Sequence, residues 1–194
     1  MKKITALLTL ATVVTGVCAQ TPVWLDPKVN QENEERAVAN YFAYESVEQA
    51  EKADKYSSSR FMSIEGDWRF NFVENANERP ENFYAVGYDD SKWDMFPVPG
   101  LFEMNGYGDR IYVNVGYVWR NQFDNNPPFV EERNNYVGSY RQNFTIPADW
   151  KGEKVYIHIG SATSNLKVWV NGKYVGYSED SKMAAEFDIT DYVE

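Results

Sequence analysis

Apolar and polar residues alternate in several short stretches from about residue 63 to the end of the chain. Trp68, Phe70 and Phe72 alternate with polar neighbours, as expected of a half-buried strand. The stretches 139–146 and 155–159 repeat this period of two residues. Because these short strands follow one another closely with no helix between them, the pattern predicts an all-β fold, an antiparallel jelly-roll β-sandwich.

The clearest single element is a hairpin near the end of the chain. Residues 168–170 are strand formers, Asn171-Gly172 is the dipeptide that a tight type I′ turn requires, and the strand resumes at Tyr174. A polar loop follows, and a further short strand is expected around 186–189. A loop that opens at a strand end and carries a carboxylate is typical of a ligand contact, so the loop Ser178-Glu179-Asp180-Ser181-Lys182 is a candidate.

Two sections lack the strand pattern. Residues 20–60 are polar, and the capping box that begins at Ser46 predicts a short helix as far as about Asp54. We expect this section to be an arm that wraps a larger body and has no core of its own. After a short strand at 95–99, residues 105–135 are irregular but rich in aromatic side chains, which predicts a structured loop lining a site or an interface.

The first 19 residues have the features of an export signal. Lys2-Lys3 precede a short apolar stretch, and Val17-Cys18-Ala19 places small residues at positions −3 and −1 of a cut before Gln20. Lipid attachment at Cys18 is an alternative, but the residues before this cysteine form a poor lipobox. We therefore expect an exported, periplasmic protein. The chain is expected to divide into a signal peptide at 1–19, an arm at 20–60 and a β-sandwich domain at 61–194.

Composition narrows the class of ligand. The expected cut removes two lysines, which changes the formal net charge from −10 to −12 and leaves no cysteine. This balance argues against nucleic acid or an anionic membrane as a partner and favours neutral or cationic ligands. The aromatic content of 16% fits sugar binding. It also fits a β-sandwich core, which is the better interpretation of composition alone.

The residues themselves indicate no catalytic machinery. CxxC, HExxH, GxSxG and phosphate-binding glycine motifs are absent, and His158, the only histidine, is interpreted as structural. The doublets Asp89-Asp90, Glu131-Glu132 and Glu179-Asp180 are poor candidates for a catalytic carboxylate pair. Adjacent strand residues point to opposite faces, and doublets in loops are usually solvated.

The chain from about residue 23 onward closely resembles the N-terminal, galactose-binding-like jelly-roll domain of glycoside hydrolase family 2 β-galactosidases of the large bacterial type. The matching motifs occur in the order found in that family. They are Ile64-Glu65-Gly66-Asp67-Trp68, Pro97-Val98-Pro99, Asn105-Gly106-Tyr107-Gly108, Ile111-Tyr112-Val113-Asn114-Val115, Asn126-Pro127-Pro128-Phe129-Val130, Val137-Gly138-Ser139-Tyr140-Arg141 and Trp169-Val170-Asn171-Gly172, followed by Gly176-Tyr177-Ser178-Glu179-Asp180-Ser181 and Glu186-Phe187-Asp188.

The resemblance implies two substrate-binding residues. Asn114 matches an asparagine that reaches into the galactoside pocket of the family, and Asp180 matches an aspartate that contacts galactosyl hydroxyls and ligates a sodium ion. An amide can both donate to and accept from sugar hydroxyls, and a carboxylate suits a hard monovalent cation. The family's catalytic glutamates and its magnesium site lie on a (β/α)₈ barrel, so no catalytic residue is expected here. The last strands of the sandwich are likewise expected beyond Glu194.

The resemblance further implies a parent β-galactosidase that hydrolyses terminal non-reducing β-D-galactose residues, with this chain alone inactive. Its expected partners are β-galactosides, the catalytic barrel of the same protein, and further copies of the parent in a homo-oligomer. A stand-alone carbohydrate-binding module is one alternative. Another family 2 enzyme, a β-glucuronidase or a β-mannosidase, is a second; the Ile-Tyr-x-Asn-Val and Asn-Pro-Pro motifs argue against it.

Overall fold

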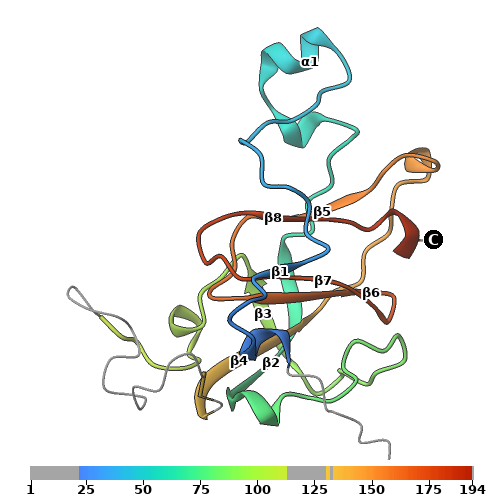
Figure 1. Ribbon diagram of the computed structural model, residues 1–194. Helices are drawn as coiled ribbons and strands as arrows, with labels where there is room; N and C mark the ends of the chain where they lie inside the picture. The colour runs from blue at the N-terminus through green and yellow to red at the C-terminus, as the bar shows by residue number, and fades with distance from the viewer. Residues whose placement is uncertain (1–21, 113–129, 132, 194) are drawn as a thin grey trace, which may run out of the picture.

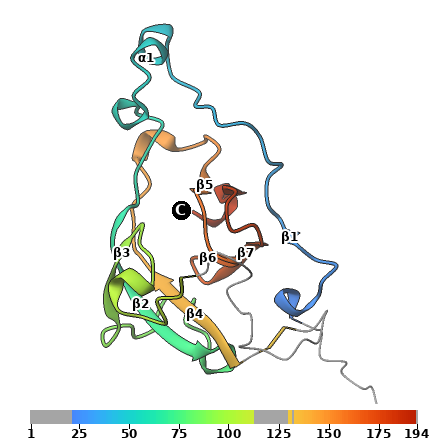
Figure 2. The same cartoon turned by 90° about the vertical axis from the view of Figure 1, so that its left-hand side faces the viewer.

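The computed structural model describes residues 22–112, 130–131 and 133–193, so the predicted export signal lies outside the described residues. Eight strands are described, and every recorded pairing between them is antiparallel. One sheet has the order β3-β2-β4, a second has the order β1-β7-β6, and β5 pairs with β8. In Figure 2, β2, β3 and β4 lie on one side, and β5, β6 and β7 lie on the other. The predicted all-β antiparallel sandwich is confirmed.

The first sheet is built around its long central strand, β2 (Gly66–Asn75), whose even-numbered aromatic residues form the predicted alternation. It pairs with β3 (Asp94–Val98) on one edge and with β4 (Arg133–Arg141) on the other. The last of these strands begins before the predicted stretch 139–146 and ends within it. Its first residues are polar and show no alternation, and a bulge interrupts their register against β2, so only the pairing reveals that they form a strand.

The second group of strands comprises β1 and β5 to β8, and it contains the predicted hairpin. The hairpin consists of β6 (Leu166–Val170) and β7 (Lys173–Ser178), joined by Asn171 and Gly172 with φ angles of 50° and 78°. Two residues with positive φ are what a type I′ turn requires, so this prediction is confirmed. The remaining strands are β1 (Gln31–Glu32), β5 (Tyr156–Ile159) and β8 (Ala185–Asp188).

Helical structure is short in the described ranges. The only α-helix described there is α1 (Val47–Lys52), and none of those helices is long and apolar enough to cross a membrane. The 3₁₀ turns are Val23–Leu25, Lys55–Ser57, Ala76–Glu78, Glu103–Asn105, Ala148–Trp150 and Thr190–Tyr192.

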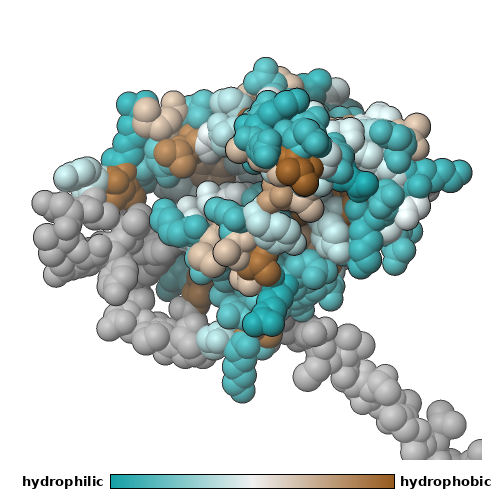
Figure 3. Space-filling model, turned by 90° about the horizontal axis from the view of Figure 1, so that it is seen from above, coloured by the Kyte–Doolittle hydropathy of each residue, from teal (hydrophilic) through white to brown (hydrophobic). Residues whose placement is uncertain are grey.

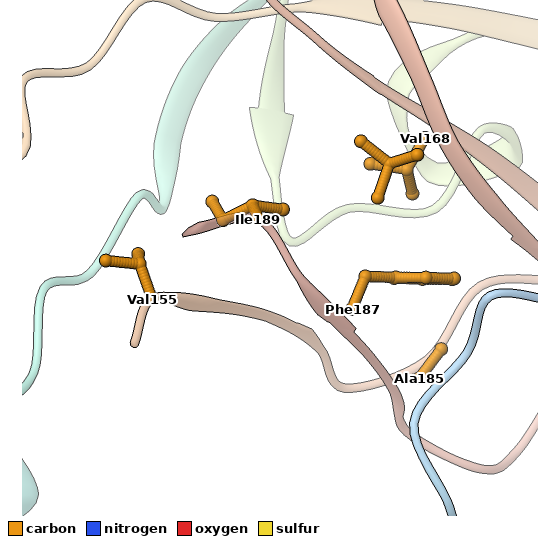
Figure 4. Close-up of a cluster of buried hydrophobic side chains, with 6 residues drawn as sticks. Val155, Val168, Ala185, Phe187 and Ile189 are labelled. Carbon is orange, nitrogen blue, oxygen red and sulfur yellow. The ribbon is translucent and has the colours of Figure 1, made fainter. Parts of the chain in front are cut away.

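Two apolar clusters hold the strands together. The first lies among the strands of the second group and is shown in Figure 4. Its buried members are Val155, Val168, Val175, Ala185, Phe187 and Ile189. The second cluster is aromatic: Phe70 of β2 and Phe96 of β3 have ring centroids 4.4 Å apart, and Phe102 and Tyr107 cover them from the segment that follows β3. Much of the high aromatic content thus contributes to packing.

The arm carries the predicted short helix and one strand that the sequence does not reveal. Ser46 caps α1 by accepting a hydrogen bond from the Gln49 N–H, as the capping box predicts. In Figure 1 the arm runs across the sheets and carries α1 at one end of the molecule. Figure 3 looks down on that end and shows a mostly hydrophilic surface with separate apolar patches. The unexpected strand is β1, because two polar residues have no detectable period.

The Glu45 carboxylate joins the two ends of the segment 45–59, a lobe that contains α1. The Glu45 Oε1 atom accepts hydrogen bonds from the Ser58 hydroxyl, the Ser59 hydroxyl and the Ser59 N–H at 2.9, 2.7 and 2.6 Å. The Ser59 hydroxyl is the largest of the influences that lower the pKa of Glu45 from 4.5 to about 2. The Trp150 Nε1–H donates to the Ser59 carbonyl at 2.7 Å and so ties the lobe to the sandwich.

We expect this lobe to loosen in acid. Because the pKa of Glu45 is lower in the folded state, its carboxylate stabilises the lobe above pH 4.5, and this contribution is lost as the pH falls toward 2. The protection factor of the Ser59 amide, corrected for intrinsic exchange, should fall over that interval. Glu45→Gln should abolish this pH dependence, whereas Glu51→Gln, an exposed change on α1, should leave it intact. An unchanged protection factor in the unsubstituted protein would contradict the prediction.

Candidate ligand-binding loop

Asp180 lies in the loop 179–184, which connects β7 to β8. Its side chain is exposed, and its Oδ1 atom accepts a hydrogen bond from the Lys182 N–H at 3.2 Å. This Asx-type contact, which spans two residues of the loop, is the one hydrogen bond of the Asp180 side chain in the described structure. The carboxylate is therefore presented to solvent at the end of a strand, where an oxygen donor can meet a ligand.

Glu179, the other member of the doublet, has a different environment. Its Oε1 atom accepts a hydrogen bond from the hydroxyl of Tyr177, a fully buried side chain. Burial, with the neighbouring Glu179 carboxylate as a smaller influence, raises the pKa of Tyr177. The loop thus begins with a carboxylate bound to the core and continues with one that faces water.

The chemistry of Asp180 fits one ligand of a sodium ion. Its carboxylate supplies hard oxygen donors, and no described lysine or arginine forms an ion pair with it. Within the described ranges, no group of three or more histidine, cysteine, aspartate or glutamate residues could hold a metal ion. The other ligands of a sodium ion at Asp180 would have to be backbone carbonyls, water or residues outside those ranges.

The second predicted substrate contact, Asn114, lies outside the described residues and stays a prediction.

Two of the remaining polar candidates, His158 and Asp90, have structural partners, whereas Glu132 lies outside the described residues. His158 is exposed on β5, and its Nδ1 atom lies 2.8 Å from the Glu186 Oε1 atom on β8. The Asp90 carboxylate accepts from the Arg141 guanidinium at 2.7 Å, and the same guanidinium donates to the carbonyls of Phe83 and Ala85. These contacts connect strands and loops and are consistent with a structural interpretation of both groups.

Residues of the arm form a part of this region that sequence reasoning missed. The backbone between Asn30 and Glu35 contacts both strands that flank the Asp180 loop, β7 and β8. The only local hint is an asparagine in a polar stretch, Asn33, which adopts a left-handed φ of 53°.

The fold and the loop together define a β-sandwich domain with an exposed polar loop that carries a candidate ligand contact. The profile of the family described as "Glycosyl hydrolases family 2, sugar binding domain" matches residues 61–194. The chain belongs to this family.

The curated relatives include several β-galactosidases. The β-galactosidase of Priestia megaterium is 41% identical over 174 residues, which cover 89% of this chain and 17% of that protein. The β-galactosidase of Halalkalibacterium halodurans is 39% identical over 170 residues, with coverages of 87% and 17%. The β-galactosidase large subunit of Leuconostoc lactis is 35% identical over 185 residues, with coverages of 88% and 29%. The chain thus spans less than a third of the length of each.

Similar solved structures include a Bacteroides uniformis β-glucuronidase, with a TM-score of 0.48 and 20% identity over 69% of this chain and 13% of that chain. A β-glycosidase from Bacteroides vulgatus gives a TM-score of 0.48 and 23% identity, with coverages of 69% and 15%.

Proposed function

We propose that this chain is the N-terminal part of a β-galactosidase that hydrolyses terminal non-reducing β-D-galactose residues in β-galactosides. The observation that carries the proposal is the 41% identity with the Priestia megaterium β-galactosidase across 89% of the chain. The family match over residues 61–194 supports a sugar-binding role for this part. The reaction itself requires a pair of catalytic carboxylates, and we expect these, with a magnesium site, in the catalytic barrel of the parent protein.

In this proposal the chain contributes one wall of the galactoside pocket. Asp180 is exposed and held by a single backbone N–H, so its carboxylate can accept a hydrogen bond from a galactosyl hydroxyl. The same carboxylate would ligate sodium, which supplies a fixed positive charge for sugar hydroxyl oxygens. Asn114 would add an amide that both donates and accepts.

Substrate specificity tests the proposal directly. The full-length protein should hydrolyse a nitrophenyl β-galactoside far faster than the corresponding β-glucuronide or β-mannoside. A preference for either of the other two glycosides would assign the parent to another activity of the same family.

The isolated 194-residue chain tests the rival interpretation. We expect it to hydrolyse none of these substrates, because its carboxylate doublets are poor candidates for a catalytic pair. If the chain were a stand-alone carbohydrate-binding module, it would bind galactose or lactose with measurable heat in calorimetry. We expect no such binding from half of a pocket.

Removing the Asp180 carboxylate should weaken galactoside hydrolysis by the full-length protein. A charge-assisted hydrogen bond contributes about 1.5–3 kcal/mol, so Asp180→Ala should lower kcat/KM by about 10- to 150-fold. Asp191→Asn, which removes another exposed carboxylate after β8, should leave kcat/KM within about twofold. Equal kinetics of Asp180→Ala and the unsubstituted protein would refute the assigned contact.

We also propose export to the periplasm and a homo-oligomeric parent. The mature protein should begin at Gln20, which N-terminal sequencing of protein from the periplasmic fraction would establish. Light scattering on the full-length protein would give its oligomeric state.

A further inference from the structure

We infer that the arm between Asn30 and Glu35 clamps both ends of the loop that carries Asp180 and thereby positions this carboxylate. The inference deepens the proposed function and rests on it for the role of Asp180. The clamp itself is defined by backbone and side-chain contacts within the described residues.

The arm first holds the end of the strand that leads into the loop. Gln31 and Glu32 pair antiparallel with Ser178 and Tyr177 along the free edge of β7. The pairing extends one residue into the loop, where the Glu179 N–H donates to the Asn30 carbonyl at 3.0 Å. The residue immediately before Asp180 is therefore fixed by the arm.

The arm then holds the strand that leaves the loop. The Glu35 N–H donates to the Glu186 carbonyl of β8 at 2.8 Å. The strands β7 and β8 belong to different hydrogen-bonded sheets. The arm thus bridges two strands that do not pair with each other and that form the two stems of the loop. In Figure 1 the arm can be followed as it crosses β7 and β8.

Asn33 makes the crossing from one strand to the next. Its φ of 53° turns the backbone away from β7, a conformation that asparagine tolerates better than most residues. Its Nδ2 atom donates to the Val175 carbonyl at 2.9 Å. Beside it, the Tyr174 hydroxyl donates to the Glu32 Oε2 atom at 2.5 Å. The side-chain contacts of Glu32 and Asn33 therefore hold the arm against β7.

Little else defines the position of the Asp180 carboxylate. Its side chain has one hydrogen bond in the described structure, and that bond lies within the loop. The distance between the stems and the direction of the first loop residue therefore determine where the carboxylate points. By thermodynamic reciprocity, a ligand that binds the positioned carboxylate must also stabilise the arm.

The clamp can be tested with a matched pair of variants in the full-length protein. Asn33→Ala removes one side-chain hydrogen bond and places alanine at a left-handed φ. Asn82→Ala does the same at a φ of 54° in an exposed turn, where Asn82 accepts from the Tyr84 hydroxyl at 3.0 Å. Hydrogen exchange followed by mass spectrometry should show at least tenfold faster exchange of 179–186 in Asn33→Ala and no change there in Asn82→Ala.

A second variant removes the hydrogen bond between the arm and β8. Glu35→Pro has no N–H to donate to the Glu186 carbonyl, and we expect it to accelerate exchange of the same segment. Unchanged exchange of 179–186 in both Asn33→Ala and Glu35→Pro would overturn the clamp. Equal acceleration in Asn33→Ala and Asn82→Ala would also overturn it, because the effect would then be one of general destabilisation.

Sodium provides a readout that a merely structural role would not change. Saturating sodium should slow exchange of the Glu35 and Glu179 amides in the unsubstituted protein. In Asn33→Ala the sodium concentration for half-maximal galactoside hydrolysis should rise at least threefold, with activity regained at saturating sodium. If sodium has no effect while Asn33→Ala still accelerates exchange locally, the clamp is supported and the proposed sodium contact of Asp180 is overturned.

Discussion

Phe70→Ala should lower the local free energy of unfolding of the β3-β2-β4 sheet by about 3–5 kcal/mol. Only 1% of Phe70 is exposed, and its ring is surrounded by other aromatic rings. These belong to Phe72, Phe96, Phe102, Tyr107 and Tyr140. Truncation removes buried apolar surface and leaves a cavity that rigid rings cannot refill.

The measurement is amide exchange of β2 and β4 in the full-length protein, converted to a local free energy of opening. Met95→Ala is the matched control, because Met95 lies on the neighbouring strand with 52% of its surface exposed. We expect its effect to stay below about 1 kcal/mol. A loss for Phe70→Ala no greater than that for Met95→Ala would mean that the aromatic cluster does not hold this sheet together.

Gly176→Val should both destabilise the second group of strands and displace the arm. A Cβ atom at Gly176 would lie 2.5 Å from the Glu32 carbonyl oxygen and 2.6 Å from the ring of Phe187, and both neighbours are confined. Overpacking of this kind costs about 1–3 kcal/mol or more, and valine adds two further methyl groups. We expect a loss of about 3 kcal/mol in the exchange of β7 and β8, together with faster exchange of the 30–35 segment.

Gly160→Val is the control for this substitution. A Cβ atom at Gly160 would meet nothing within 4 Å, so valine there should change the free energy of opening by less than about 1 kcal/mol. If Gly176→Val were tolerated equally well, the close passage of the arm over β7 would be wrong.

The elements predicted correctly are those whose signals are local. The alternation of Trp68, Phe70 and Phe72 predicted β2, because the side chains of a strand point alternately to its two faces. Asn171-Gly172 predicted the hairpin turn, because both residues tolerate positive φ. Ser46 predicted the start of α1 through a bond to a backbone N–H three residues away.

The candidate site also has one part that the sequence predicted and another that only the structure reveals. Its exposed carboxylate at the end of β7 could be predicted, because the hairpin places the loop and the resemblance singles out Asp180. Asn114 stays a prediction, since it lies outside the described residues. No sequence pattern could predict that the arm contacts the two strands that flank this loop, because β1 has only two residues and both are polar.

By itself, then, the sequence determined the all-β class, the hairpin, the helix cap and the membership of the chain in its sugar-binding family. Each of these depends on side chains and backbone groups close together along the chain, or on motifs kept in order. Only the tertiary structure decided how the arm meets the Asp180 loop, where β4 begins and which rings bury Phe70. Those contacts join residues as far apart as Asn33 and Val175, which are 142 positions apart. The backbone pairing of β1 with β7 likewise leaves no mark on the residue types that make it.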